Sequence, residues 1–156
     1  MSAGSTLGKH YDEVAVGEKW RSHGRTVTEA DIVFWCTFTG DMFVLHTDAH
    51  YAAKTPFGQR IAPGLMVNAF MAGLGVPPGA PAIVANYGTD ALRFTAPVFI
   101  GDTVHLETEV IGKEERRQGR DGVVTLQWNA VNQNGKTVMS SQLKCLMGVR
   151  AKEARA

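Results

Sequence analysis

Apolar residues at helical spacing in the first third of the chain predict a short helix over residues 28–39. Thr28 offers a side-chain oxygen that can cap its start, and acidic residues occupy the first turn. Gly40 is expected to end it. Four side chains follow one another at i, i+3, i+4 and i+7 and form a buried face, namely Ile32, Trp35, Cys36 and Thr39. Another helical turn or two is expected over residues 49–54.

A second helix is expected over residues 61–74. It is apolar on nearly every side, with Asn68 as the exception. Because a helix that is hydrophobic all round has no face for water, we expect other structure to surround it. The glycines and prolines of residues 75–81 then enforce a loop.

The rest of the chain alternates apolar and polar residues with the period of two that half-buried strands show. Strands are expected at 83–87, 92–95, 104–110, 124–130 and 139–147. Asn134-Gly135 is a strong hairpin signal between the last two. Helices followed by about five antiparallel strands predict an α+β domain in which a curved antiparallel sheet wraps a central apolar helix, the arrangement called a hotdog fold.

Length and composition fit one such domain. Of 156 residues, 44% are hydrophobic and 20% are charged, enough for one core and too little for two. We place the domain at residues 11–150, between a flexible N-terminal tail at 1–10 and a C-terminal tail at 151–156. Cys36 and Cys145 lack metal-type spacing and are interpreted as small core residues.

The charge balance and the apolar runs restrict the partners. Sixteen basic and fifteen acidic residues give a net charge of +1, which provides no electrostatic basis for binding nucleic acid or an anionic membrane. No apolar run approaches the roughly eighteen residues of a membrane span, and the first nine residues lack the apolar stretch of a signal peptide. A cytoplasmic protein is expected.

Asp41 and His46 follow the first helix and form the first candidate site. Turn geometry after Gly40 can bring this carboxylate and imidazole toward one small volume. A histidine titrates near neutral pH, and a nearby carboxylate orients its ring, so the two can act as a general acid and base. The alternative is a purely local role in a helix-ending turn.

Gly64, at the start of the apolar helix, is the second candidate. The first N–H groups of a helix lack partners, and a glycine lets a substrate oxygen approach the backbone, so the Gly64 N–H can receive developing negative charge. The alternative is that residues 61–64 only end one helix and begin the next, with no functional role.

Several short motifs, in their order and separation, resemble the MaoC-like family of hotdog-fold acyl-CoA dehydratases and (R)-specific enoyl-CoA hydratases. The resemblance covers about residues 11–149. It is carried by Arg25-Thr26-Val27-Thr28-Glu29-Ala30-Asp31, Thr39-Gly40-Asp41, Leu45-His46-Thr47-Asp48, Tyr51-Ala52, Phe57-Gly58, Ile61-Ala62-Pro63-Gly64 and Phe94-Thr95-Ala96-Pro97-Val98-Phe99-Ile100-Gly101-Asp102.

This resemblance implies a domain that pairs with a second copy and adds water reversibly to the double bond of a trans-2-enoyl thioester, giving an (R)-3-hydroxyacyl product. Coenzyme A or an acyl carrier protein would be the handle, and no metal or redox cofactor would be needed. The family's aspartate and histidine fall on Asp41 and His46, and its helix-start glycine falls on Gly64. A homodimer or higher homo-oligomer is therefore expected.

The chain also departs from the family pattern. Phe43-Val44 replaces an Asn-Pro pair common before the Leu-His, and Pro63 stands where many members have histidine. Phe43, Phe57, Ala62 and Pro63 are candidates for lining an acyl pocket, with ordinary core packing as the alternative for the two aromatics. Two other functions remain open, namely thioester hydrolysis and a non-catalytic subunit that only binds acyl thioesters.

Overall fold

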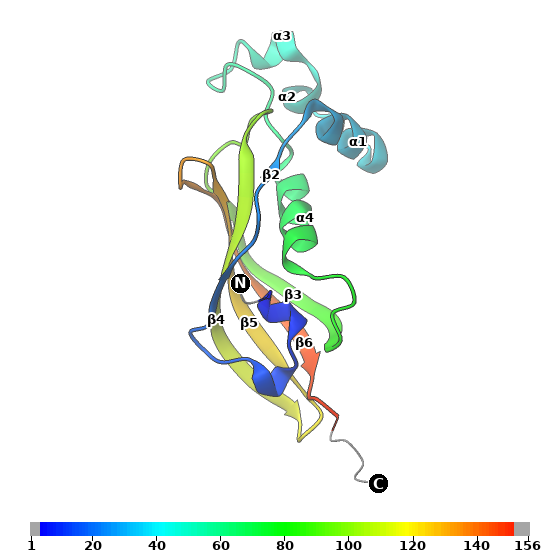
Figure 1. Cartoon of the computed structure of the whole chain (residues 1–156). Helices are drawn as coiled ribbons and strands as arrows, with labels where there is room; N and C mark the ends of the chain where they lie inside the picture. The colour runs from blue at the N-terminus through cyan, green and yellow to red at the C-terminus, as the bar shows by residue number, and fades with distance from the viewer. Residues whose placement is uncertain (1–3, 152–156) are drawn as a thin grey trace.

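The computed structural model describes residues 4–151, and a curved antiparallel sheet dominates this part of the chain (Figure 1). The sheet has the order β1-β4-β5-β6-β3, and β2 also pairs with β4. Its six strands are β1 (Lys19–Arg21), β2 (Arg25–Thr26), β3 (Ile83–Phe94), β4 (Thr103–Arg117), β5 (Asp121–Asn132) and β6 (Thr137–Gly148). The β5–β6 connection contains Asn134-Gly135, with Gly135 at φ 74°, which confirms the predicted turn.

The longest helix packs on one face of this sheet, and three helices project beyond one of its ends (Figure 1). The helices of the described residues are the 3-10 turns η1 (Thr6–Gly8) and η2 (Tyr11–Glu13), and the α-helices α1 (Glu29–Thr39), α2 (Val44–Thr47), α3 (Ala49–Ala52) and α4 (Gly64–Gly75). The expected α+β arrangement, a curved antiparallel sheet around a central apolar helix, is therefore confirmed.

The core lies between α4 and the sheet. Met66, Val67 and Met71 of α4 are almost fully buried, and they belong to the same apolar cluster as Leu106 and Leu126 of the sheet. Burial of each such side chain contributes about 1.5–3 kcal/mol, so this contact fixes the position of α4. Both cysteines are buried and free, as predicted.

The ends of α1 form as its sequence predicts. The Thr28 side chain accepts a hydrogen bond from the Asp31 N–H at 3.3 Å, and the Asp31 carboxylate accepts one from the Thr28 N–H at 2.8 Å. This capping box satisfies two donors that the helix start would otherwise leave free. Gly40, at φ 76°, ends the helix and turns the chain toward α2.

The expectation of two separate strands at 83–87 and 92–95 was wrong. The structure has one continuous strand, β3, where two were expected, because the polar and glycine residues between them still pair with β6 across three register shifts. Helix α4 is covered on one side only: Leu65 is 58% exposed although the helix is apolar all round. One copy of the chain therefore leaves part of the apolar surface of α4 exposed.

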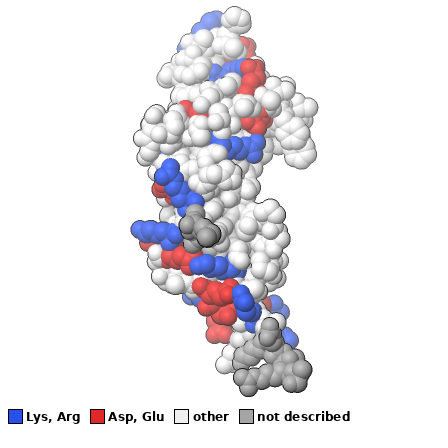
Figure 2. Space-filling view, viewed as in Figure 1, with Lys and Arg blue, Asp and Glu red and all other residues white. Residues whose placement is uncertain are grey.

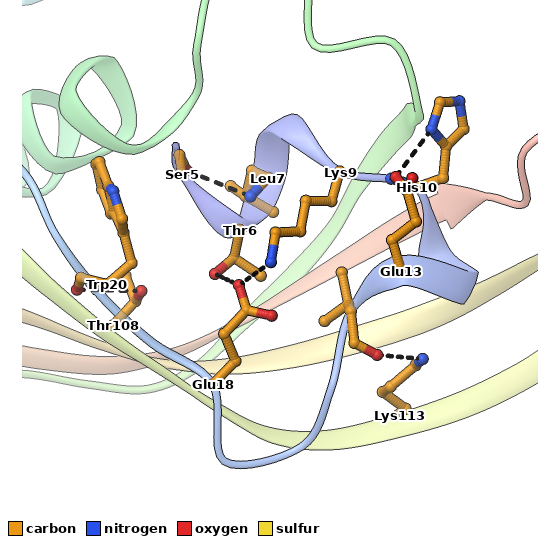
Figure 3. A network of polar contacts seen from close by, with 11 residues as sticks. Ser5, Thr6, Leu7, Lys9, His10, Glu13, Glu18, Trp20, Thr108 and Lys113 are labelled. Atoms are coloured by element: carbon orange, nitrogen blue, oxygen red, sulfur yellow. Dashed lines mark hydrogen bonds and ion pairs between the residues drawn. The ribbon is translucent and has the colours of Figure 1, made fainter. Parts of the chain in front are cut away.

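The N-terminal segment packs onto the domain, in contrast to the flexible tail expected over residues 1–10. Leu7 is 1% exposed and belongs to the core, and the Ser5 hydroxyl donates to the Gly75 carbonyl at the end of α4. The Glu18 carboxylate accepts hydrogen bonds from Thr6 and Lys9 at 3.0 and 2.8 Å (Figure 3). Residues 1–3 and 152–156, which hold the rest of both expected tails, lie outside the described residues.

Charged side chains of both signs are interspersed on the face shown in Figure 2, and no continuous basic stripe crosses it. Within residues 4–151, no helix is both long and apolar enough to cross a membrane.

Candidate active site

A cavity of about 400 Å³ lies at the start of α4, where α2 and the segment after β3 meet this helix. His46 and Gly64, which the sequence singled out separately, both line it. Most of its other walls are apolar and include Phe57, Val67 and Phe94. The cavity therefore combines one titratable ring and one helix N-terminus in an otherwise nonpolar space.

A backbone carbonyl fixes the ring of His46. Its Nδ1 lies 2.8 Å from the Ile61 carbonyl oxygen. A carbonyl oxygen only accepts hydrogen bonds, so Nδ1 must carry the proton, and Nε2 of the neutral ring is left with a free lone pair. Phe43 adds an edge-on contact, with 5.7 Å between the ring centroids. The half-buried imidazole is thus oriented as a base.

Backbone contacts with the segment after β3 hold Ile61 in place. It forms an isolated β-bridge with Phe99, and the Ala62 N–H donates to the Val98 carbonyl at 2.8 Å. These contacts connect the segment before α4 to the loop after β3. The carbonyl that orients His46 therefore belongs to a rigid part of the fold.

Gly64 is the first residue of α4, and Pro63 caps the helix without a side-chain hydrogen bond. The first N–H groups of the helix consequently keep their hydrogen-bonding capacity and the positive end of the helix dipole. A Cβ at residue 64 would lie 2.8–2.9 Å from the Phe94 ring, a distance that real Cβ atoms essentially never show. A side chain larger than that of glycine would therefore require the exposed Phe94 ring to shift.

Asp41 lies on the other side of the Gly40 turn, and its side chain is exposed. Its N–H donates to the Thr39 hydroxyl at 3.2 Å. Burial chiefly raises the pKa of the Cys36 thiol, and the nearby Asp41 carboxylate raises it further, which places this charge beside the last turn of α1. Among the described residues that line the cavity, Asp41 does not appear. The structure thus joins His46 with Gly64 but not with Asp41.

The four candidate lining residues have different positions. Phe57 and Ala62 line the cavity, whereas Pro63 is buried beside it as the α4 cap. Phe43 is 54% exposed and touches the cavity only through His46. Since Phe57 is also 38% exposed, neither aromatic is an ordinary core residue.

The sequence interpretation missed the wall contributed by Phe94 at the end of β3 and by Ala96 and Val98 in the segment after it. The proline in Thr95-Ala96-Pro97 signals that this strand ends, and a chain leaving a sheet beside a helix start is the usual setting for a site. It also missed the Ile61 carbonyl, because a backbone hydrogen bond across fifteen residues leaves no pattern in the side chains.

A curved antiparallel sheet around a central helix defines the hotdog class of protein. A solved protein from Mycobacterium tuberculosis described as having a double hotdog fold matches 96% of this chain with a TM-score of 0.77 at 19% identity, which supports the fold alone. The MaoC-like domain model matches residues 12–132. The chain belongs to the MaoC-like domain family.

Curated relatives agree with this assignment. The chain is 36% identical to Protein MaoC of Klebsiella aerogenes over 122 residues, which are 78% of this chain and 36% of that protein. It is 39% identical to a 3-hydroxybutyryl-CoA dehydratase of Methylorubrum extorquens over 98 residues, 62% of this chain and 61% of that one. An (R)-specific enoyl-CoA hydratase of Rhodospirillum rubrum is 34% identical over 72% of this chain and 76% of its own length.

Another solved structure also corresponds to nearly the whole chain. A protein described as a monoamine oxidase regulatory protein from Archaeoglobus fulgius matches 97% of this chain and 99% of its own, with a TM-score of 0.84 and 32% identity. By contrast, the chain spans only about a third to three fifths of the Klebsiella and Methylorubrum relatives.

Proposed function

We propose that this protein is a hydro-lyase that adds water reversibly, in the syn sense, to a trans-2-enoyl thioester and gives an (R)-3-hydroxyacyl thioester. The observation that carries this proposal is the shared cavity of His46 and Gly64, with the His46 Nε2 left free as a base. The names of the relatives, which include dehydratases and a hydratase, support the same reaction class.

The Gly64 N–H would stabilise the charge that forms when water attacks. Addition at the β-carbon moves electrons to the thioester carbonyl oxygen, and an N–H at the positive end of α4 can hydrogen-bond that oxygen. One such donor contributes about 3 kcal/mol to the transition state in other enzymes. The absence of a Cβ beside the Phe94 ring leaves the N–H accessible to substrate.

His46 and Asp41 would move the two protons. One group takes a proton from water as its oxygen bonds to the β-carbon, and the other gives a proton to the α-carbon, so the enoyl group gains one water in total. The free Nε2 of His46 supports its role as one of the two. Asp41 is proposed as the second group because it corresponds to the family's aspartate, and its exposed side chain, which is outside the cavity lining, would have to turn toward a water shared with the imidazole.

The acyl group would be carried as a thioester of coenzyme A or of an acyl carrier protein. The Methylorubrum and Rhodospirillum relatives are named for coenzyme A thioesters. The chemistry proposed here uses only proton transfer and a backbone donor, so it requires no metal or redox cofactor. Dialysis against a chelator should therefore leave the rate unchanged.

A parallel assay tests the proposal against both alternatives. The purified protein is incubated with trans-2-butenoyl-CoA while the enoyl absorbance and the free thiol are followed together. We expect the enoyl band to disappear without thiol release. Thiol release would instead identify a thioesterase, and binding without either signal would identify a non-catalytic acyl-thioester-binding subunit.

A further inference from the structure

A second, smaller cavity follows the first along the face of α4 that is turned toward the sheet. It encloses about 130 Å³ between this helix and the β3 and β6 side of the sheet, which lie alongside α4 in Figure 1. On α4, Gly64 and Val67 line the first cavity, and Asn68 and Ala72 line the second, together with Val76 just after the helix. On β6, the walls pass in the same way from Val138 to Ser141. The two cavities therefore follow one another along α4 and β6.

Ser141 gives the second cavity an unusual polar group. Its side chain is 1% exposed, and its Oγ has no hydrogen-bond partner among the described residues. A buried hydroxyl without a partner is costly, and such groups in native proteins call for an explanation. A ligand oxygen in the cavity would supply the missing partner.

The remaining walls indicate that this ligand group is uncharged. Leu143, Trp128 and Ala72 present carbon, and Asn68 and Thr89 present neutral polar groups. Cys145 also lines the space, and burial raises the pKa of its thiol to about 11, so it stays protonated. No lysine, arginine, aspartate or glutamate is among the described residues that line this cavity.

The dimensions of the fold indicate how long a bound chain must be. From Gly64 to Ala72, α4 advances about 12 Å at 1.5 Å per residue. From Val138 to Ser141, β6 advances about 10 Å at 3.3 Å per residue. An extended acyl chain zigzags and advances about 1.25 Å per bond, so an oxygen on the eighth carbon, eight bonds from a thioester carbonyl carbon at Gly64, lies about 10 Å away.

We propose that the second cavity binds the distal end of an acyl chain of about eight carbons and that the Ser141 hydroxyl hydrogen-bonds an uncharged oxygen carried there. Ser141 is thereby a specificity residue that favours hydroxylated or keto acyl groups over plain alkyl ones. This inference rests on the proposed hydration of enoyl thioesters and adds a substrate class to it.

Three substrates test the inference on the full chain. They are trans-2-butenoyl-CoA, trans-2-octenoyl-CoA and 8-hydroxy-trans-2-octenoyl-CoA. For the wild-type protein, we expect kcat/KM for the hydroxylated octenoyl substrate to exceed that for the plain one about fivefold, the effect of one net hydrogen bond. In Ser141→Ala, this ratio should fall to about one.

Ser140→Ala is the matched control, because Ser140 is the neighbouring serine on β6 and its hydroxyl accepts from Gln127 outside the cavity. It should keep the fivefold ratio. Ala72→Leu fills the cavity from the helix side independently of Ser141, and it should lower kcat/KM for both octenoyl substrates at least tenfold relative to trans-2-butenoyl-CoA.

The outcomes separate this inference from the function on which it rests. If no enoyl-CoA is hydrated, the proposed function fails and this inference with it. If trans-2-butenoyl-CoA is hydrated but the wild-type protein does not distinguish the two octenoyl substrates, only the inference is overturned. A preference that persists in Ser141→Ala would overturn it as well, because the hydroxyl would then be recognised elsewhere.

Discussion

His46 is oriented at one nitrogen by the main chain and is free at the other, a division that suits a base. The Ile61 carbonyl fixes the Nδ1 tautomer, and the contact of Ile61 with Phe99 fixes that carbonyl in turn. A side-chain partner could be lost by one substitution, whereas this backbone acceptor persists whatever residue stands at 61. The tautomer is therefore determined by the fold.

Replacing either proposed proton-transfer residue should abolish most activity. His46→Gln and Asp41→Asn are each expected to lower the rate of hydration of trans-2-butenoyl-CoA about 100-fold or more, because each removes a general acid or base. His50→Gln is the control, since His50 is an exposed histidine on α3. Circular dichroism and a thermal melt should show an unchanged fold in all three. A rate near that of wild type in Asp41→Asn would remove this residue from the mechanism.

Gly64→Ala should weaken both the fold and the reaction. Its Cβ would press into the Phe94 ring, and overpacking of this kind costs about 1–3 kcal/mol. Gly73→Ala is the matched control within α4, because a Cβ there meets nothing within 4 Å and alanine favours a helix by about 0.5–1 kcal/mol. Urea unfolding measures both, and a Phe94→Ala second substitution should restore the stability of Gly64→Ala. Equal stability of the two alanine variants would contradict the contact.

The sequence singled out His46 and Gly64, which the structure brings to one cavity, and Asp41, which it does not. Residue types and spacing left a purely local role open for these residues, and the resemblance to the MaoC-like family favoured the site, while the part of the cavity made by packing was missed. Phe94 approaches Gly64 from thirty residues away, and its position depends on the register shift between Asp90 and Arg93 in β3. No local pattern encodes such a shift.

At the level of secondary structure, α1 shows the strongest agreement between local sequence and form. Thr28 and Asp31, three residues apart, form its capping box, and Gly40 ends the helix in the left-handed conformation. Strand β3 shows the opposite case, because Ala91 at φ 51° and three irregular pairings interrupt its alternation. Local signals determine helix ends well, whereas an irregular edge strand is determined by its neighbour.

The capping box predicts a pH dependence for stability. Partial burial acts to raise the pKa of Asp31, but hydrogen bonds from Thr28 and Arg25 outweigh it, and the pKa lies below its usual 3.8. A carboxylate with a lowered pKa in the folded state stabilises the fold above its unfolded pKa, and this contribution is lost as the pH falls through the folded value. Asp31→Asn should therefore cost about 1 kcal/mol at pH 7.

Urea unfolding of wild type and Asp31→Asn between pH 7 and pH 3 measures this effect. The difference in unfolding free energy should be constant at neutral pH and should begin to shrink below about pH 4. Glu29→Gln is the control in the same turn, since its carboxylate is 61% exposed in a surface ion pair with Arg60 and contributes little. A difference that grows on acidification would have the wrong sign for a lowered pKa.

The whole molecule presents apolar surface that one copy leaves uncovered. On α4, Leu65 is 58% exposed, and on β3, Val84 and Tyr87 are 55% and 53% exposed. Strand β3 is also the last strand of the sheet order, so its outer edge is unpaired among the described residues. An open edge next to an apolar helix face favours association with a second copy.

We therefore expect a homodimer in solution. Light scattering after gel filtration should give a mass about twice the 16.9 kDa of one chain at micromolar concentration. Val84→Lys should shift the protein toward the single-chain mass by placing a charge on the β3 surface, whereas a lysine at exposed Val16, far from β3 in the sequence, should not. A single-chain mass for the unmodified protein at these concentrations would refute the expectation.

The sheet order also constrains when the chain can fold during its own synthesis. Strand β3 precedes β4 in the chain but pairs with β6, which is the last strand of this sheet to be synthesised. Until β6 emerges, α4 and β3 lack much of the surface on which they pack. The apolar helix α4 is therefore exposed to solvent in the nascent chain until β6 has been synthesised. We expect this domain to complete its fold only after β6 has been synthesised, with nascent-chain chaperones shielding α4 in the interval.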